Sequence, residues 1–379
     1  MNTPVYLDYN ATTPIDPEVA AAMWPFVSTH FENPSSSYQG GQTVKQAIAE
    51  ARQQVAELIN AFPEEIVFTS GGTESNNHAI RGIIDHPENK GNHIITSSIE
   101  HPAITEVCKY LESHGNEITY IPVDSTGKVN PEHVKKAVRP DTVLISIMHA
   151  NNEVGTIQPI REIANIAKQN HVPFHTDAAQ SAGKIHTDIK DLGVDLLSIA
   201  GHKLYAPKGI GVLYIKKGTR LANLLYGAGQ EKGIRPGTEN VPYIVALGKA
   251  AEIAHLNLKT NAANMSATRD RLINGLKNQV ETNVIVNGDL PNALPNTLSV
   301  AFEGIDAHAL TSLVGNKLCI STGSACHADS VELSPVLKAM NIDHLKGAGT
   351  IRFSTGRSTT NEEIDYAIEA LSETVKNLI

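Results

Sequence analysis

The 379-residue sequence predicts an α/β fold with a parallel sheet covered on both faces, together with a second, smaller α+β domain. Three observations carry this prediction. Short apolar runs alternate along the chain with segments whose apolar residues recur at helical spacing. Many of these runs are continuously apolar, as expected for strands that are buried on both faces. After a mostly helical stretch at 241–280, the order of strand-like and helix-like segments changes.

The elements follow in order along the chain. Val44, Ile48, Val55 and Leu58 recur at helical spacing and predict a helix before the first strand of the sheet. The expected strands of the sheet are 66–69, 94–97, 118–123, 143–148, 172–177, 196–199 and 211–215. The expected helices between them are 73–84, 102–113 and 160–169, and the later strands are 296–302 and 350–354. We therefore expect a large domain at 15–255 and a small domain made of 1–14 and 256–379.

Composition excludes several classes of protein. Hydrophobic residues make up 41% of the chain and charged residues 19%, which is typical of a globular protein. The net charge is −9 and no stripe is dense in Lys or Arg, so neither a nucleic acid nor a membrane surface is an expected partner. The first eight residues lack the basic and apolar regions of a secretory signal. With three cysteines, the sequence predicts a cytoplasmic protein without a disulfide framework.

Two segments could bind an anionic, ring-bearing ligand. The stretch 71–77, Gly-Gly-Thr-Glu-Ser-Asn-Asn, follows an expected strand and opens a helix, where free amides and the helix dipole can hold a phosphate. A plain strand-to-helix turn capped by Thr73 is an equal alternative. Asp177 ends another expected strand, where α/β folds bind ligands, and could pair with a protonated pyridine nitrogen. Its alternative role is to cap the next helix.

Two further segments carry reactive side chains. Lys203 follows an apolar strand and a glycine, and a desolvated lysine suits Schiff-base chemistry, although most lysines are solvated like Lys208. Cys326 lies among small residues at 321–329 that predict a loop, and His327 beside it could lower the thiol pKa. Cys319 and Cys108 are expected to be buried and structural.

A metal site is the alternative that the histidines raise. His171, His175 and Asp177 lie close together in the sequence and could serve a metal-dependent hydrolase. No His-Glu-x-x-His or paired Cys-x-x-Cys pattern accompanies them, so no metal is expected. A non-catalytic sulfur-binding or redox protein using Cys326 alone is a third possibility.

Taken together, the motifs resemble the NifS/IscS-type cysteine desulfurases and the related selenocysteine lyases, which are fold-type I enzymes dependent on pyridoxal 5'-phosphate (PLP). The likeness runs through essentially the whole chain, in order. Each motif alone is weak, but the ordered set is specific. The matching stretches are 6–14, 71–77, 100–101, 151–155, 176–180, 201–203, 235–240, 323–326 and 351–357.

The resemblance implies the fold and the residues around the cofactor ring. It implies a mixed, mostly parallel seven-stranded sheet in the large domain. Lys203 would carry the cofactor as a Schiff base and move protons, Asp177 would pair with the pyridine nitrogen, and Gln180 would bind the ring hydroxyl. His101 would stack on the ring face and belongs with the catalytic residues.

The phosphate group has its own set of residues by the same resemblance. Gly72, Thr73 and His202 would hold it, and Thr238 would reach it from the neighbouring subunit, which implies a homodimer. Many relatives have Ser where this chain has Ala200, so the details of the phosphate site differ here.

The substrate site and the sulfur acceptor complete the resemblance. Asn152, which would also contact the cofactor, and Arg352 would bind the carboxylate of L-cysteine, and Cys326 would take the sulfur as a persulfide while alanine leaves. Pro102 stands where animal selenocysteine lyases often have Asp, which favours cysteine over selenocysteine. Selenocysteine lyase and aminotransferase chemistry remain the alternatives on this fold.

The segment 326–335 resembles the longer catalytic loop of the NifS/IscS branch, which can carry a persulfide outward to an acceptor or scaffold protein. The pathway is open among iron–sulfur cluster assembly, tRNA thiolation, selenium supply and DNA modification.

Overall fold

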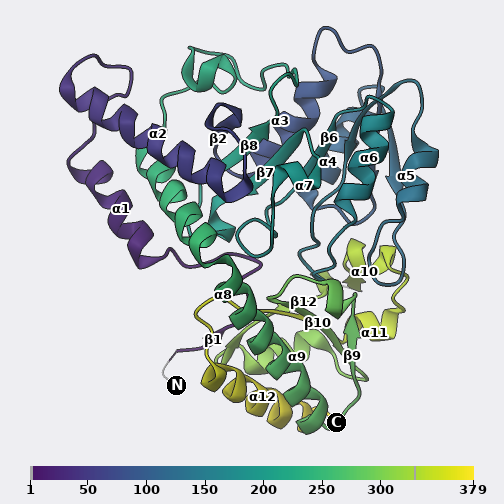
Figure 1. Cartoon of the computed structure of the whole chain (residues 1–379). Coiled ribbons are helices and arrows are strands. Elements are labelled where there is room, and N and C mark those ends of the chain that lie inside the picture. The colour runs from purple at the N-terminus through teal and green to yellow at the C-terminus, as the bar shows by residue number, and fades with distance from the viewer. Residues whose placement is uncertain (1–2, 328–329) are drawn as a thin grey trace.

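The computed structural model of the chain describes residues 3–327 and 330–379, and within 324–332 it describes strands but not side chains. Two layered units lie one above the other in Figure 1, and the long helix α8 (Val241–Gln279) runs from the upper unit into the lower one. The expected boundary between residues 255 and 256 falls inside this continuous helix, and it stays a prediction.

The upper unit is built on one seven-stranded sheet. Its strand order is β2-β8-β7-β6-β5-β3-β4, and only β8 runs antiparallel to its neighbours. The strands are β2 (Ile66–Thr69), β3 (His93–Ser97), β4 (Glu117–Ile121), β5 (Thr142–Ser146), β6 (Phe174–Asp177), β7 (Leu196–Ala200) and β8 (Gly211–Ile215). The predicted α/β class and the mixed, mostly parallel sheet are confirmed, with strand ends displaced by up to a few residues.

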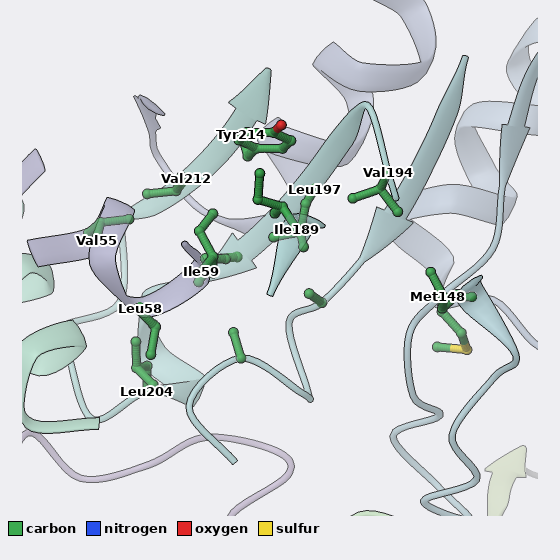
Figure 2. Packing of buried hydrophobic residues seen from close by; sticks show 14 of the residues in the cluster. Val55, Leu58, Ile59, Met148, Ile189, Val194, Leu197, Leu204, Val212 and Tyr214 are labelled. Atoms are coloured by element: carbon green, nitrogen blue, oxygen red, sulfur yellow. The ribbon is translucent and has the colours of Figure 1, made fainter. Parts of the chain in front are cut away.

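Both faces of the sheet are buried, as the continuous apolar runs predict. Successive strand residues alternate between two cores: Ile94 packs into one and Ile95 into the other. Helices α3 (Gly72–Ile84) and α4 (Pro102–Glu112) cover the first face. The opposite face packs against α2 (Gln39–Ile59), α5 (Pro131–Ala137), α6 (Ile160–Gln169), α7 (Ile189–Leu192) and the start of α8. Figure 2 shows Ile59 of this second layer close to Leu197 and Val212 of the sheet.

Local signals set the ends of the helices. Helix α1 (Pro17–Ser28) begins with Pro17 after Asp16, whose Oδ1 accepts a 2.7 Å hydrogen bond from the Glu18 backbone N–H. Helix α2 ends at Asn60, which adopts a left-handed φ of 54°. Among the described helices, none combines the length and the apolar character that crossing a membrane requires.

The lower unit contains an antiparallel sheet with the order β12-β15-β10-β9. Its strands are β9 (Val284–Asn287), β10 (Thr297–Phe302), β12 (Ser321–Thr322) and β15 (Thr350–Ser354). Helices α9 (Ala307–Val314), α12 (Asn361–Lys376) and the last part of α8 bury its apolar face. The N-terminal strand β1 (Val5–Tyr6) pairs with β11 (Leu318–Cys319), so the chain start belongs to this core. In Figure 1 the short helix α10 (Pro335–Ala339) lies between the two units, and the short helix α11 (His344–Ala348) lies beside the lower sheet.

The cysteines depart from expectation in two places. The segment predicted as a loop forms an antiparallel hairpin of β13 (Ser324–His327) and β14 (Ser330–Leu333), with Cys326 opposite Val331. We call this pair of strands the cysteine hairpin; the side chain of Cys326 lies outside what the structure describes. Cys108 is buried in α4 as predicted, whereas Cys319 is only half-buried, because its strand is a two-residue pair at the edge of the small core.

Candidate active site

The predicted site residues meet at one edge of the large sheet. Strands β2, β3, β5, β6 and β7 run in the same direction, so their carboxyl ends share this edge. A cavity of about 490 Å³ opens there, with Arg352 of the lower unit on its wall. Nine predicted residues line it: Gly72, Thr73, His101, Asn152, Asp177, Gln180, His202, Lys203 and Arg352. A larger groove of about 1020 Å³ lies at the opposite edge and contains none of them.

One end of the cavity is suited to a phosphate. Gly72 and Thr73 form the first turn of α3, where backbone N–H groups lack partners within the helix and the helix dipole favours an anion. A Cβ on Gly72 would lie 3.2 Å from the Cβ of Ala200, so glycine allows the start of α3 to approach the end of β7 closely. The His202 ring Nδ1 lies 3.1 Å from the Thr12 hydroxyl, and burial lowers its pKa to about 4. His202 is therefore a neutral hydrogen-bonding group at pH 7.

Asp177 is held rigidly at the base of the cavity. It ends β6 and is 7% exposed. Its Oδ2 accepts a 2.7 Å hydrogen bond from Asn76 Nδ2, and its Oδ1 accepts a 2.8 Å bond from the Ala179 backbone N–H. A fixed carboxylate that only accepts hydrogen bonds is suited to a protonated ring nitrogen.

His101 presents a flat, neutral ring to the cavity. It caps α4, and its Nδ1 accepts a 3.1 Å hydrogen bond from the Ala103 backbone N–H, which leaves the proton on Nε2. Burial lowers the pKa of His101, the Lys203 cation lowers it further, and the Asp177 carboxylate opposes both. A neutral imidazole can stack on an aromatic ring, as the sequence predicts.

Lys203 places a half-buried amine on the wall of the cavity. A short 3-10 turn, Gly201–Lys203, follows β7 and places Nζ near the backbone carbonyls of Asn10 and Ala11, with a 2.8 Å hydrogen bond to the latter. Burial lowers its pKa to about 8, helped by the Arg352 cation and opposed by Asp8 and Asp177. The neutral amine needed for a Schiff base is therefore well populated near pH 8.

Arg352 brings the lower unit into the site. Its Nη2 donates to Asp8 Oδ1 at 2.6 Å and to Ser321 Oγ at 3.0 Å, and its Nη1 donates to the Asn152 carbonyl at 3.4 Å. Its Nε is buried without a hydrogen-bond partner in the described part of the chain. The guanidinium thus has donors left for a substrate carboxylate next to Asn152.

Two predicted residues remain. Thr238 does not line the cavity and is exposed on the segment before α8. Cys326 lies in the cysteine hairpin, and its side chain lies outside what the structure describes. Three residues that were not predicted hold the predicted ones in place: Asp8, Asn10 and Asn76. All three lie inside the stretches that carried the resemblance, and that was the signal that could have revealed them.

The metal-hydrolase alternative has no support in the geometry. His175 Nδ1 lies 2.8 Å from Ser146 Oγ, and its Nε2 lies 3.0 Å from Ser198 Oγ, so both ring nitrogens are occupied inside the sheet. Burial lowers its pKa to about 3, and His171 is exposed. Among the side chains that the structure describes, the only cluster with metal-ligand spacing is His186, Asp188 and Asp191, which lies elsewhere.

A half-buried lysine of lowered pKa, a buried carboxylate and a helix N-terminus around one cavity are the groups that a PLP-dependent enzyme on a mixed α/β sheet requires. The chain belongs to the aminotransferase class-V family, whose model matches residues 5–367. The predicted family, fold and PLP cofactor are confirmed.

Individual relatives match over the full length. The chain is 47% identical over 379 residues to a protein of Dictyoglomus turgidum named cysteine desulfurase IscS, covering 100% of this chain and 96% of that one. It is 48% identical over 378 residues to the protein of the same name from Methanosarcina thermophila, covering 100% and 93%. A solved NifS-like protein superposes with a TM-score of 0.93 at 39% identity, covering 99% of this chain and 100% of that one. A structure described as SspA in complex with cysteine gives 0.82 at 39% identity, covering 94% and 99%.

Proposed function

We infer that this chain is a cysteine desulfurase that converts L-cysteine to L-alanine and takes the sulfur as a persulfide. The observation that carries this conclusion is the cavity in which Lys203, Asp177 and the first turn of α3 converge, in a chain whose full-length relatives carry that activity in their names.

The donor set fits PLP, with Lys203 as its anchor. Asp177 would hold the pyridine nitrogen, Gln180 the ring hydroxyl and His101 the ring face. Gly72, Thr73 and His202 would hold the phosphate. When bound, the cofactor stores the negative charge left on the substrate when its Cα proton is removed.

The protein's own groups carry the remaining steps. Arg352 and Asn152 orient the substrate carboxylate, and Lys203 Nζ takes the Cα proton. The Cys326 thiolate attacks the substrate sulfur, so that an S–S bond forms and the bond between that sulfur and Cβ breaks. The electron pair of the broken bond stays with the substrate, whose carbon is protonated to give alanine. The persulfide on Cys326 then passes to an acceptor or scaffold protein, and the place of Cys326 in a two-stranded sheet of its own supports such a delivery.

We also propose that two chains form a homodimer with shared sites. Large rings are exposed on one side of the upper unit: Phe31 is 80% exposed, Tyr38 59% and Tyr226 89%. A groove of about 670 Å³ joins the turn at 34–35 to the segment at 228–239, so these rings flank the surface that carries Thr238. An exposed apolar surface of this kind favours a partner chain.

Mixed dimers test the shared site. Lys203→Ala subunits and Thr238→Val subunits should each bind PLP poorly or in a changed form. A mixture of the two rebuilds one intact site per mixed dimer, so normal Lys203-bound absorbance should return. A monomer in sedimentation equilibrium, or no recovery after mixing, would contradict the shared site.

A reducing, cytoplasmic setting is part of the proposal, because a reactive thiol at Cys326 and a half-buried thiol at Cys319 would oxidise in a disulfide-forming compartment. Iron–sulfur cluster assembly is the pathway we propose first, with tRNA thiolation, selenium supply and DNA modification as the other destinations.

The decisive experiment is incubation of the purified yellow protein with L-cysteine, followed by mass spectrometry and alanine analysis. We expect alanine in the solution and one added sulfur atom on the peptide that contains Cys326. A keto acid product would indicate an aminotransferase, and turnover of selenocysteine alone would indicate a selenocysteine lyase.

A further inference from the structure

A second lysine lies behind the cofactor cavity. Lys184 is 5% exposed, and it is absent from the residues that line the cavity. Its Nζ donates to Gln180 Oε1 at 3.0 Å and to Asn10 Oδ1 at 3.2 Å. Both acceptors are neutral amide oxygens, so this buried ammonium has no carboxylate among its hydrogen-bond partners in the described chain.

Stability does not account for a charge in this place. Burial lowers the pKa of Lys184 to about 7, and the nearby cations Lys203 and Arg352 lower it further. Burying a cation against neutral partners costs free energy that an apolar side chain of similar length would not cost. The placement therefore requires a reason beyond folding.

That reason lies in the direction of the Gln180 amide. Its Nε2 donates to the Asn10 backbone carbonyl at 2.9 Å, while its Oε1 accepts from Lys184. The ammonium form of Lys184 only donates and a carbonyl only accepts, so in that form turning the amide over would place donor against donor and acceptor against acceptor. Lys184 and the Asn10 carbonyl therefore allow only one orientation of the Gln180 amide. In that orientation, the second hydrogen of Nε2 remains available for another acceptor.

Asn10 links this arrangement to the reacting groups. Its backbone carbonyl accepts from both Gln180 and Lys203, and its Nδ2 donates to the Asn152 carbonyl at 3.0 Å. Its Oδ1 accepts from Asn296 Nδ2 at 2.9 Å as well as from Lys184. The ammonium thus fixes one end of a network whose other end reaches the cavity.

We propose that Lys184 is a positioning residue that acts through Gln180, holding its amide so that an N–H, and not the carbonyl oxygen, faces the ring hydroxyl of PLP. The proposal rests on the proposed function, because the contact between Gln180 and the ring hydroxyl belongs to it. A carbonyl turned toward an anionic ring oxygen would repel it, so loss of Lys184 should weaken the cofactor without removing any group that touches it.

A double-mutant cycle tests this proposal with PLP affinity and the absorbance maximum of the bound cofactor as readouts. Lys184→Met keeps the length and removes the donor, Gln180→Met removes the amide, and the double variant removes both. We expect Lys184→Met to weaken PLP binding about fivefold, the value of one neutral hydrogen bond, and to shift the absorbance. In the Gln180→Met background the same change should have no effect.

Exposed Lys190→Met is the matched control for the loss of one positive charge and should leave both readouts unchanged. Equal losses from Lys184→Met in both backgrounds would overturn the proposal, because Lys184 would then act on the fold and not through Gln180. A wild-type protein that takes up no PLP would instead refute the proposed function itself.

Gln180→Glu provides a second test that does not depend on the folding of Lys184→Met. It keeps a partner for Lys184 but replaces the N–H donor by an oxygen. We expect PLP binding to fall at least as far as in Gln180→Met. Affinity equal to that of the wild type would show that only the contact with Lys184 matters, which overturns the proposal.

Discussion

The cofactor cavity and the cysteine hairpin are held in opposite ways. In the cavity, Asp177, Gln180 and Lys203 each make at least two hydrogen bonds to other parts of the chain. The two strands of the hairpin form a separate two-stranded sheet. The described hydrogen bonds that join the hairpin to the rest of the protein lie at its base. There, Gly323 N–H donates to the Thr350 carbonyl at 2.8 Å and Ser334 Oγ donates to Glu153 Oε2 at 2.6 Å.

The difference corresponds to two tasks. Proton removal needs reacting groups fixed to within a fraction of an ångström, which a hydrogen-bonded sheet edge provides. Sulfur transfer needs a thiol that meets the substrate and then an acceptor, which a two-stranded element outside both larger sheets can provide. Substitutions in the cavity should therefore change cofactor binding, and those in the hairpin should change sulfur transfer alone.

The largest expected effect is that of Lys203→Ala. It removes the only lysine on the cavity wall in the described chain, so the absorbance of covalently bound PLP and all turnover should disappear. Absorption spectra and borohydride reduction check this, with circular dichroism to verify folding. A reducible chromophore on another lysine would contradict the assignment, and exposed Lys208→Ala is the control that should behave as wild type.

Cys326→Ala should separate the two regions. We expect normal PLP content and a normal spectral change on adding L-cysteine, because the cavity is untouched. Persulfide formation and alanine release should fall to a negligible rate, since the sulfur has no acceptor. Cys319→Ala is the matched control and should retain both reactions. Persulfide mapped to Cys319, or near-normal alanine release by Cys326→Ala, would refute this role.

The pH dependence of Lys203 sharpens the description of the cavity. Only the neutral amine attacks an aldehyde, and the pKa of Lys203 is lowered to about 8, chiefly by burial. The rate at which the apoprotein combines with pyridoxal should therefore rise about tenfold per pH unit below 8 and level off above it. The positive charge of Arg352 is the second cause of the lowered Lys203 pKa, so Arg352→Gln should move the midpoint of the curve of rate against pH to higher pH. A rate that keeps rising to pH ~10 would mean an unperturbed lysine.

Glu153 tests the base of the hairpin. Burial raises the pKa of its carboxyl, while the Ser334 hydrogen bond and the Arg352 cation oppose the rise. Glu153→Gln keeps an oxygen that can accept from Ser334, whereas Glu153→Ala leaves the hydroxyl without this partner. We expect Glu153→Ala to slow persulfide formation several-fold, about the effect of one hydrogen bond, with unchanged PLP affinity, and Glu153→Gln to stay near wild type. Equal rates of persulfide formation in both variants would show that the hydrogen bond between Ser334 and Glu153 does not position the hairpin.

The sheet is predicted well because it follows from local patterns, whereas most of the residues that line the cavity were predicted from the family resemblance. Continuous apolar runs such as 196–199 identify buried strands, and residues at their carboxyl ends, including Asp177, must meet at one edge. The cysteine hairpin escapes prediction because its small residues show no periodicity of two. Lys184 escapes because its partner Asn10 lies 174 residues away, so its burial depends on tertiary structure alone.

The smallest expected effect is that of Ala200→Ser, at the phosphate end of the cavity. The Cβ of Ala200 faces the first turn of α3, next to Gly72, so a hydroxyl at this position can donate to a phosphate there. PLP affinity, measured by titration of the apoprotein, should be equal to wild type or tighter by up to ~1 kcal/mol, about fivefold. Ala200→Val adds methyl groups in the same place without a donor and should weaken binding by crowding Gly72. A clear loss of PLP affinity in Ala200→Ser would mean that the phosphate does not bind next to Ala200. The phosphate-binding residues would then lie away from the first turn of α3.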